Sequence, residues 1–129
     1  MFVDSSAWFE YFSGGRRGTL VRTRMDGSET LLSSSVVLAE LCSKYVRSGE
    51  AGSVDARMAF IQKQCAVIEI TAEIGLAAGR IHAEEKAKKG KFSLADALVL
   101  ATARSRASLV LTFDADFSGL DDAIVLDAP

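Results

Sequence analysis

Short apolar segments alternate with longer amphipathic segments along the whole chain, and this alternation constrains the fold more than any other feature. We expect strands at the apolar segments, residues 1–3, 29–32, 66–70, 109–113 and 123–126. We expect helices between them, at residues 5–12, 19–25, 36–47, 52–64, 71–89 and 93–106. Strands that are apolar on both faces belong to parallel sheets covered on each side by helices. The sequence therefore predicts a three-layer α/β/α domain with a central parallel sheet.

The composition is that of one compact globular domain, residues 1–129, with 49% of the residues hydrophobic. The 15 basic and 17 acidic side chains give a net charge of −2, which excludes a strongly basic nucleic-acid coat and an acidic disordered tail. Cys42 and Cys65 have neither a zinc-binding spacing nor a disulfide framework, so we expect two buried free thiols. No apolar run reaches the roughly 20 residues of a membrane span, and no basic leader precedes Asp4. We therefore expect a cytoplasmic protein without membrane association.

Two acidic residues directly follow predicted strands. Asp4 comes after the strand at residues 1–3, and Asp114 comes after the strand at residues 109–113. In open α/β sheets, ligands bind beyond the carboxyl ends of the strands, near the point where the strand order reverses. If the two strands are neighbours, both carboxylates lie at this edge. The structural alternatives are a helix cap for Asp4 and a turn residue for Asp114.

Asp96 lies in the first turn of a predicted helix, on a face that is otherwise apolar. Its neighbours one and two turns later are Val99, Leu100 and Ala103, and no basic residue lies one turn away. Ser93 could cap this helix with Asp96 as its partner, which is the structural alternative. A carboxylate on an apolar face is costly unless a cation pairs with it. We therefore favour a metal-binding role for Asp96.

Glu40 shares the polar side of its predicted helix with Ser43, Lys44 and Arg47. An ordinary ion pair with Lys44, one turn later, is the default interpretation of this residue. Glu40 becomes a candidate site residue only together with the other acids.

Several common kinds of catalytic site are missing from the sequence. His82 is the only histidine and has no nearby acid or nucleophile, so we expect it on a helix surface rather than in a catalytic triad. Neither of the common glycine-rich phosphate-binding motifs occurs. A carboxylate cluster is the remaining catalytic resource, and its hard oxygen ligands suit Mg²⁺ or Mn²⁺.

Four segments of the sequence resemble the PIN-domain nucleases, and among them the VapC-type toxins of type II toxin–antitoxin systems. The segments are FVDSSAWFEYF, SSSVVLAEL, FSLADALVLATA and LVLTFDADF, in this order. Each motif is weak alone, but their order and spacing fit the family across essentially the whole chain.

This resemblance implies a PIN-like fold and a set of site residues. The acids that match the family's catalytic and metal-binding positions are Asp4, Glu40, Asp96 and Asp114, with supporting residues Ser6, Thr112 and Asp116. It further implies that Mg²⁺ or Mn²⁺ relieves the repulsion among the acids and activates a water molecule, which cleaves RNA endonucleolytically. The implied partners are a small VapB-type antitoxin and a second copy of the chain.

Basic and aromatic side chains suggest surfaces for the substrate and for partners. Lys44 and Arg47 share the face of Glu40 and are the preferred phosphate contacts. Further candidate cations are Arg16, Arg17, Arg22 and Arg24, and the lysine run Lys86, Lys88, Lys89 and Lys91, which we interpret as a solvated helix end. The aromatic residues at positions 8, 9, 11 and 12 exceed what one short helix needs to bury, so we expect some of them to face a partner, as in a homodimer.

Other classes of protein also place acids at the rim of an α/β sheet. A phosphohydrolase with an aspartate nucleophile would carry a second acid two residues after the first, where this chain has Ser6. A receiver-like signalling domain would end a central strand in an aspartate, whereas the segment at residues 66–70 is followed by Thr71. A non-catalytic PIN scaffold that binds RNA or a partner stays open, although the four acids weigh against it.

Overall fold

The computed structural model describes residues 1–28 and 30–126. Five short parallel strands form one sheet in the order β3-β2-β1-β4-β5. The strands are β1 (Phe2–Val3), β2 (Leu32–Ser34), β3 (Ala66–Ile68), β4 (Val110–Thr112) and β5 (Ala123–Val125). The strand β1 occupies the centre of the sheet, with β2 on one side and β4 on the other.

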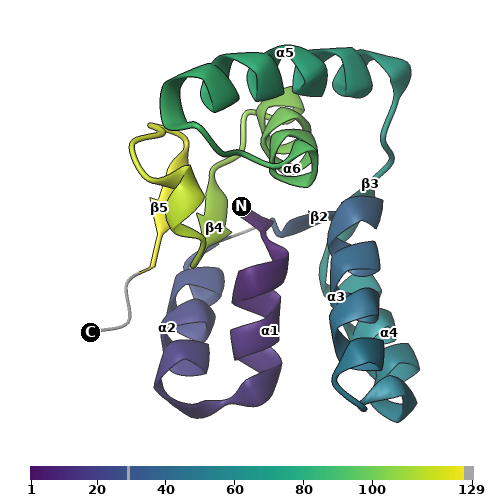
Figure 1. Cartoon of the computed structure of the whole chain (residues 1–129). Helices are drawn as coiled ribbons and strands as arrows, with labels where there is room; N and C mark the ends of the chain where they lie inside the picture. Colours follow the sequence, from purple (N-terminus) through teal and green to yellow (C-terminus); the bar gives the residue numbers. More distant parts are fainter. Residues whose placement is uncertain (29, 127–129) are drawn as a thin grey trace.

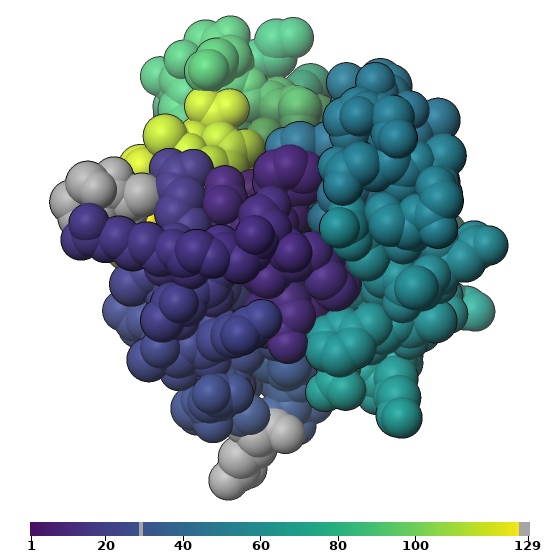
Figure 2. Space-filling view, turned by 90° about the horizontal axis from the view of Figure 1, so that it is seen from below, coloured from purple at the N-terminus to yellow at the C-terminus, as the bar shows by residue number. Residues whose placement is uncertain are grey.

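Six helices cover the sheet on both faces, which confirms the predicted three-layer α/β/α architecture. They are α1 (Ser5–Ser13), α2 (Gly15–Asp26), α3 (Ser35–Arg47), α4 (Val54–Gln64), α5 (Ala72–Lys89) and α6 (Leu94–Ser105), with 3₁₀ turns at η1 (Ala51–Ser53) and η2 (Ala115–Phe117). Helices α1 to α4 lie on one face, and α5 and α6 lie on the other (Figure 1). Seen from the first face, α1 lies between α2 and the α3–α4 pair (Figure 2).

The helix ends follow the local signals in the sequence. Thr71 caps α5 by accepting a hydrogen bond from the Ile74 N–H at 3.2 Å, and Gly90 ends this helix with a φ of 76°. Ser93 caps α6 by accepting from the Asp96 N–H at 2.9 Å. The end of α5 at Gly90 and the cap at Ser93 fix where α6 begins, and therefore where Asp96 lies.

Two of the predicted strands differ from the observed ones. Strand β2 lies at Leu32–Ser34, rather than at residues 29–32, of which residue 29 lies outside the described residues. Ser33 and Ser34 follow the predicted strand, but both belong to β2 and are fully buried because β2 pairs with β1 and β3 at once. The predicted strand at residues 66–70 ends at Ile68 and lies at the edge of the sheet, so that only Ile68 is buried in it.

An aromatic cluster joins α1 to the helices beside it. Trp8 is fully buried and packs against Tyr11, Phe12 and Phe60, with ring centroids 5.1, 5.6 and 6.2 Å away. The other three aromatic residues of α1 are only half-buried. Burying one such ring stabilises the fold by about 2 kcal/mol, so this cluster anchors the helix that directly follows Asp4.

The two cysteines differ in burial. Cys65 is buried, and its burial raises the pKa of its thiol to about 11. Cys42 is only half-buried, so the expectation of two buried thiols is wrong for this residue. None of the helices in the described ranges is long and apolar enough to cross a membrane.

Candidate active site

The carboxyl edge of the sheet collects the acidic residues that follow β1 and β4. These strands are neighbours, as the sequence analysis required, and the Asp4 N–H donates to the Leu111 carbonyl at 3.0 Å. From β1, the chain proceeds toward β2 on one side of the sheet, and β4 joins β1 on the other. The crevice between β1 and β4 is therefore the switch point at which open α/β sheets bind ligands.

Asp4 is held by hydroxyl groups from two different segments. Its side chain is almost completely buried, and its Oδ2 accepts hydrogen bonds from Thr112 Oγ1 at 2.7 Å and from Ser6 Oγ at 3.4 Å. Ser6 Oγ also accepts from the Phe113 N–H at 3.0 Å, and Thr112 Oγ1 accepts from the Asp114 N–H at 2.9 Å. Burial raises the pKa of Asp4, against the opposing effect of the Thr112 hydrogen bond. Hydrogen bonds through Ser6 and Thr112 thus connect the Asp4 carboxylate to the backbone of Phe113 and Asp114.

Asp96, Asp114 and Asp116 form a group whose carboxylate oxygens lie within 4.8 Å of one another. Asp114 Oδ1 accepts from the Asp116 N–H at 2.8 Å, which turns the chain into η2 and brings both acids to the same edge. Burial, followed by the negative charge of Asp114, raises the pKa of Asp96 to about 6. Asp96 is therefore both the capping-box residue of α6 and a member of an acidic cluster.

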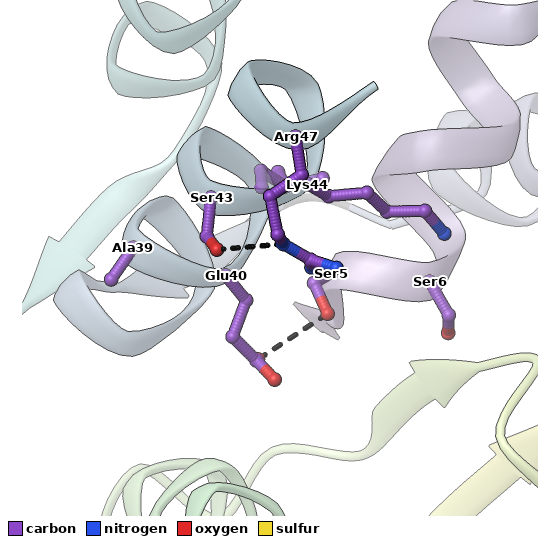
Figure 3. A pocket seen from close by; sticks show the side chains of 8 residues that line it. Ser5, Ser6, Ala39, Glu40, Ser43, Lys44 and Arg47 are labelled. Atoms are coloured by element: carbon purple, nitrogen blue, oxygen red, sulfur yellow. Dashed lines mark hydrogen bonds between the residues drawn. The ribbon is translucent and has the colours of Figure 1, made fainter.

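Glu40 faces the same cluster from α3. Its Oε1 accepts a hydrogen bond from Ser5 Oγ at 3.3 Å across the gap between α3 and α1 (Figure 3). Burial raises the pKa of Glu40 to about 7, and the charges of Asp4, Asp96 and Asp114 contribute to this rise. The four acids that the sequence analysis selected therefore affect one another electrostatically at one edge of the sheet.

The ion pair expected between Glu40 and Lys44 does not form. The Lys44 Nζ lies 3.7 Å from the centroid of the Phe9 ring instead, and no ion pair among the described residues includes Glu40. A cation over an aromatic face is attracted by the ring quadrupole, which competes with a solvated ion pair worth well under about 1 kcal/mol. This leaves the Glu40 carboxylate available to the cluster.

A cleft of about 450 Å³ extends from this edge between α1 and α3. Its polar lining comes from both helices: Ser5, Ser6, Glu40, Ser43, Lys44 and Arg47 (Figure 3). Arg47 Nε donates to Ser43 Oγ at 3.2 Å. The cleft thus combines one acid of the cluster, Glu40, with two cations from the same helix.

The other candidate cations are mostly engaged elsewhere. Arg17 pairs with Glu10 at 3.2 Å, and the Arg22 guanidinium lies 4.9 Å from the Tyr11 ring centroid. Lys86 and Lys88 are exposed, as expected for a solvated helix end, although the Lys88 Nζ lies 3.8 Å from Glu85 Oε1. That interpretation is wrong for Lys89, whose Nζ donates to the Ser118 carbonyl at 3.1 Å. Lys91 is 81% exposed, and its Nζ also lies 3.5 Å from Asp116 Oδ1.

Sequence reasoning missed two residues at this edge, Ser5 and Ser34. Ser5 bonds to Glu40, and its position directly after Asp4 was the available signal. The Ser34 hydroxyl is buried and has no hydrogen-bond partner among the described residues, at the carboxyl end of β2. Lys89 was a candidate cation, but its partners could not be predicted, because they lie 27 and 29 residues away in the chain.

The donor set fits a divalent cation. Carboxylates from several segments meet, and burial raises the pKa values of Asp4, Glu40 and Asp96. The only ion pair that reaches the cluster in the described structure joins Asp116 to the exposed Lys91. Hard oxygen ligands of this kind favour Mg²⁺ or Mn²⁺, which use few protein groups. A cation would relieve the mutual repulsion of the acids.

The chain matches the family model described as "PIN domain" over residues 1–123, and it belongs to this family. In fold it is similar to VapC20 of Mycobacterium tuberculosis, described as a sarcin–ricin-loop-cleaving toxin, with 22% identity, a TM-score of 0.78 and coverage of 94% of this chain and 95% of that one. A DNA-bound VapBC from Salmonella typhimurium gives 18% identity, a TM-score of 0.76 and coverage of 98% and 96%. A toxin–antitoxin complex from Klebsiella pneumoniae gives 21% identity, a TM-score of 0.75 and coverage of 96% and 95%.

No curated protein sequence matches the chain. The resemblance to PIN domains is thus confirmed as a family relation, and the fold is shared with VapC toxin structures.

Proposed function

We propose that this protein, as a single PIN domain over residues 1–129, is a metal-dependent endoribonuclease and the toxin of a toxin–antitoxin pair. The observation that carries the proposal is the convergence of acids at the switch point of a PIN domain, where the described residues supply a single ion pair, that of Lys91 with Asp116. Burying and crowding like charges costs free energy, and folds retain such an arrangement where a ligand offsets it. The intact acids favour an enzyme over a non-catalytic scaffold.

The residues that would hold Mg²⁺ or Mn²⁺ are Asp4, Asp96 and Asp114, with Glu40 and Asp116 at the margins of the cluster. When bound, such a cation supplies Lewis acidity, which makes a water molecule more acidic and polarises a phosphodiester. Thr112 and Ser6 keep the Asp4 carboxylate oriented by their hydrogen bonds. The rigid edge of the sheet thus presents its acids in a fixed geometry.

Glu40 is the group best suited to move a proton. Its pKa of about 7 means that it exchanges a proton readily near neutral pH, and its carboxylate faces the cleft. It can take the proton that an attacking water loses and keep it on a carboxylate oxygen, while Ser5 Oγ holds the side chain in place. His82 has no part in this chemistry.

RNA is the proposed substrate, and Lys44 and Arg47 are its proposed phosphate contacts. Both cations line the cleft that opens from the acids, which lets a strand approach the cluster along a positive wall. The overall charge of −2 makes this local positive charge important for binding a polyanion. The description of VapC20 as a sarcin–ricin-loop-cleaving toxin supports RNA rather than a small phosphate ester.

A small VapB-type antitoxin and a second copy of the chain are the proposed partners. Structures similar in fold are described as toxin–antitoxin complexes, which supports the first. The half-buried Phe9, Tyr11 and Phe12 leave apolar surface on α1, which supports a protein interface. Light scattering of the purified chain should give a dimeric mass, and a strictly monomeric mass at high concentration would contradict the homodimer.

The central test is RNA cleavage with and without divalent cations. Purified protein should cleave structured RNA in Mg²⁺ or Mn²⁺, and EDTA should abolish this cleavage. Cleavage that continues undiminished in EDTA would overturn the metal-dependent mechanism. RNA binding without cleavage under all conditions would favour the non-catalytic scaffold.

A further inference from the structure

We propose that Lys89 is a positioning residue that clamps the η2 turn and thereby sets the affinity of the acidic cluster for a divalent cation. Lys89 is the last residue of α5, whereas η2 follows β4 and carries Asp116, two residues after Asp114. The consequence for catalysis rests on the proposed function. The clamp itself is a structural statement that can be tested without RNA.

The Lys89 ammonium group bridges two segments that are distant in sequence. It donates to the backbone carbonyls of Asp116 and Ser118, which flank the end of η2. Its side chain is only 26% exposed, whereas that of its neighbour Lys88 is 70% exposed. A lysine that gives up solvent and rotamer freedom in this way does so for specific partners.

Glu85 holds the ammonium group of Lys89 in place from one turn earlier on α5. The Glu85 side chain is only 10% exposed, and its Oε2 lies 3.6 Å from Lys89 Nζ. A carboxylate this deeply buried needs a nearby positive charge. Glu85, Lys89 and the two carbonyls therefore form a series of polar contacts that connects α5 to the turn.

The turn is also held by aromatic packing. Phe117, within η2, is fully buried and packs edge-to-face on Phe92, with ring centroids 5.7 Å apart. The Lys89 Nζ lies 5.4 Å from the centroid of the Phe92 ring, so the ammonium group and the ring pair contact each other. The turn is therefore held by the apolar contact of Phe117 with Phe92 and by the hydrogen bonds that Lys89 donates to its carbonyls.

The turn has little stabilisation of its own. It is three residues long, and its internal hydrogen bonds run from the Asp116 and Phe117 N–H groups to Asp114 and from the Ser118 N–H to the Ala115 carbonyl. Asp114 and Asp116 have carboxylate oxygens within 4.8 Å of those of Asp96, which belongs to a different helix. Like-charge repulsion pushes these groups apart, so an external restraint on the turn is needed to keep the cluster closed in the metal-free protein.

The test compares Lys89→Met with Lys88→Met. Lys88 also contacts Glu85, at 3.8 Å, but has no contact with the turn, which makes it a matched control. In the metal-free protein, Lys89→Met should speed hydrogen exchange at the Asp116, Phe117 and Ser118 amides at least tenfold. It should also weaken Mn²⁺ binding about tenfold, the usual effect of removing a group that orients metal ligands. Lys88→Met should change neither, and Lys89→Arg should restore most of both.

Equal exchange rates in Lys89→Met and Lys88→Met would overturn the clamp, and faster exchange with unchanged Mn²⁺ affinity would overturn its role at the cluster. If Lys89→Met does not fold, Lys89→Gln, which keeps one donor without the charge, takes its place under the same criteria. Wild-type protein that binds no Mn²⁺ contradicts the proposed function, and the exchange rates still decide whether Lys89 holds the turn.

Discussion

The carboxylates at the two ends of α6 have opposite electrostatic environments. At the C-terminal end, Arg104 donates to both carboxylate oxygens of Asp122, at 2.6 and 3.2 Å, and these hydrogen bonds lower the pKa of Asp122. At the N-terminal end, Asp96 has no cation, and burial together with Asp114 raises its pKa to about 6. The positive end of the helix dipole favours an ionised Asp96, so burial and neighbouring charges outweigh it.

The difference separates a stabilising arrangement from a binding arrangement. The Arg104–Asp122 pair satisfies both of its charges within the chain and needs nothing from outside. The acids around Asp96 repel one another, and the basic side chains near them are too few to offset their negative charge. Perturbed pKa values of this kind concentrate at functional sites, because the folded chain alone gains nothing from them. The comparison predicts that mutations at the two ends have opposite effects on stability and activity.

Asp96→Asn should have the largest effect. It keeps the shape of the side chain but removes one ligand charge, so we expect RNA cleavage to fall at least about 1000-fold, since a charged group acting on the transition state is lost. The metal-free variant should be as stable as the wild type or more stable, by about 1 kcal/mol at pH 7. Mg²⁺ should raise the Tm of the wild type more than that of the variant.

Asp122→Asn is the matched control at the other end of the helix. It should lose up to about 1 kcal/mol of stability, because the pair is partly exposed, and should cleave RNA normally. Thermal melts in EDTA and in Mg²⁺, beside one cleavage assay, measure all of these effects. Normal cleavage together with reduced stability in Asp96→Asn would mean that this residue is only a helix cap.

The pH dependence of stability sharpens the same contrast. The pKa values of Asp96 and Glu40 are raised to about 6 and about 7, so the folded metal-free protein binds more protons than the unfolded chain between about pH 4 and pH 7. The contribution of these two groups to the free energy of unfolding therefore falls as the pH rises through this window. Relative to Asp96→Asn, the wild type should lose on the order of 1 kcal/mol from pH 4 to pH 7, after allowance for solvent screening.

Urea unfolding of both proteins at several pH values in EDTA measures this difference, and saturating Mg²⁺ should reduce it. A difference that stays constant between pH 4 and pH 7 would contradict the raised pKa of Asp96.

Arg47→Gln should reduce RNA binding several-fold. Arg47 lines the cleft, and removing one phosphate contact should lower the slope of log K against log salt by about 0.7 for a single strand. Arg80→Gln, on the exposed surface of α5 in the opposite layer, is the control and should leave the slope unchanged. Binding titrations with catalytically inactive Asp96→Asn protein at several salt concentrations provide the measurement. Equal slopes for the two arginine variants would remove Arg47 from the substrate path.

Lys91→Ala should have the smallest effect. Lys91 pairs with Asp116 at 3.5 Å, but its side chain is 81% exposed, so the pair contributes a few tenths of a kcal/mol at most. Its removal should leave the Tm within about one degree of the wild-type value and tighten Mn²⁺ binding less than about twofold, because one competing cation is gone. Calorimetric Mn²⁺ titration checks this prediction. Weakened Mn²⁺ binding would show that Lys91 organises the site instead of competing for it.

Local signals in the sequence were enough to predict most of the secondary structure and the acids that follow it. The caps at Thr71 and Ser93 and the stop at Gly90 act within one helical turn, so they can be read from neighbouring residues. Asp4 and Asp114 were predictable candidates because both directly follow apolar strands, and α/β sheets bind ligands beyond the carboxyl ends of strands. The motifs also predicted the family, which the match over residues 1–123 bears out.

Contacts between distant segments could not be predicted in this way. The order of the strands buried Ser33 and Ser34 and left Ala66 exposed at an edge, although the serines are the more polar residues. Lys44 faces Phe9 instead of Glu40, because α1 packs beside α3 and offers an aromatic face. Lys89 finds carbonyls that lie 27 and 29 residues later in the chain. A side chain's partner depends on which surfaces packing brings together, and no local pattern in a single sequence contains that information.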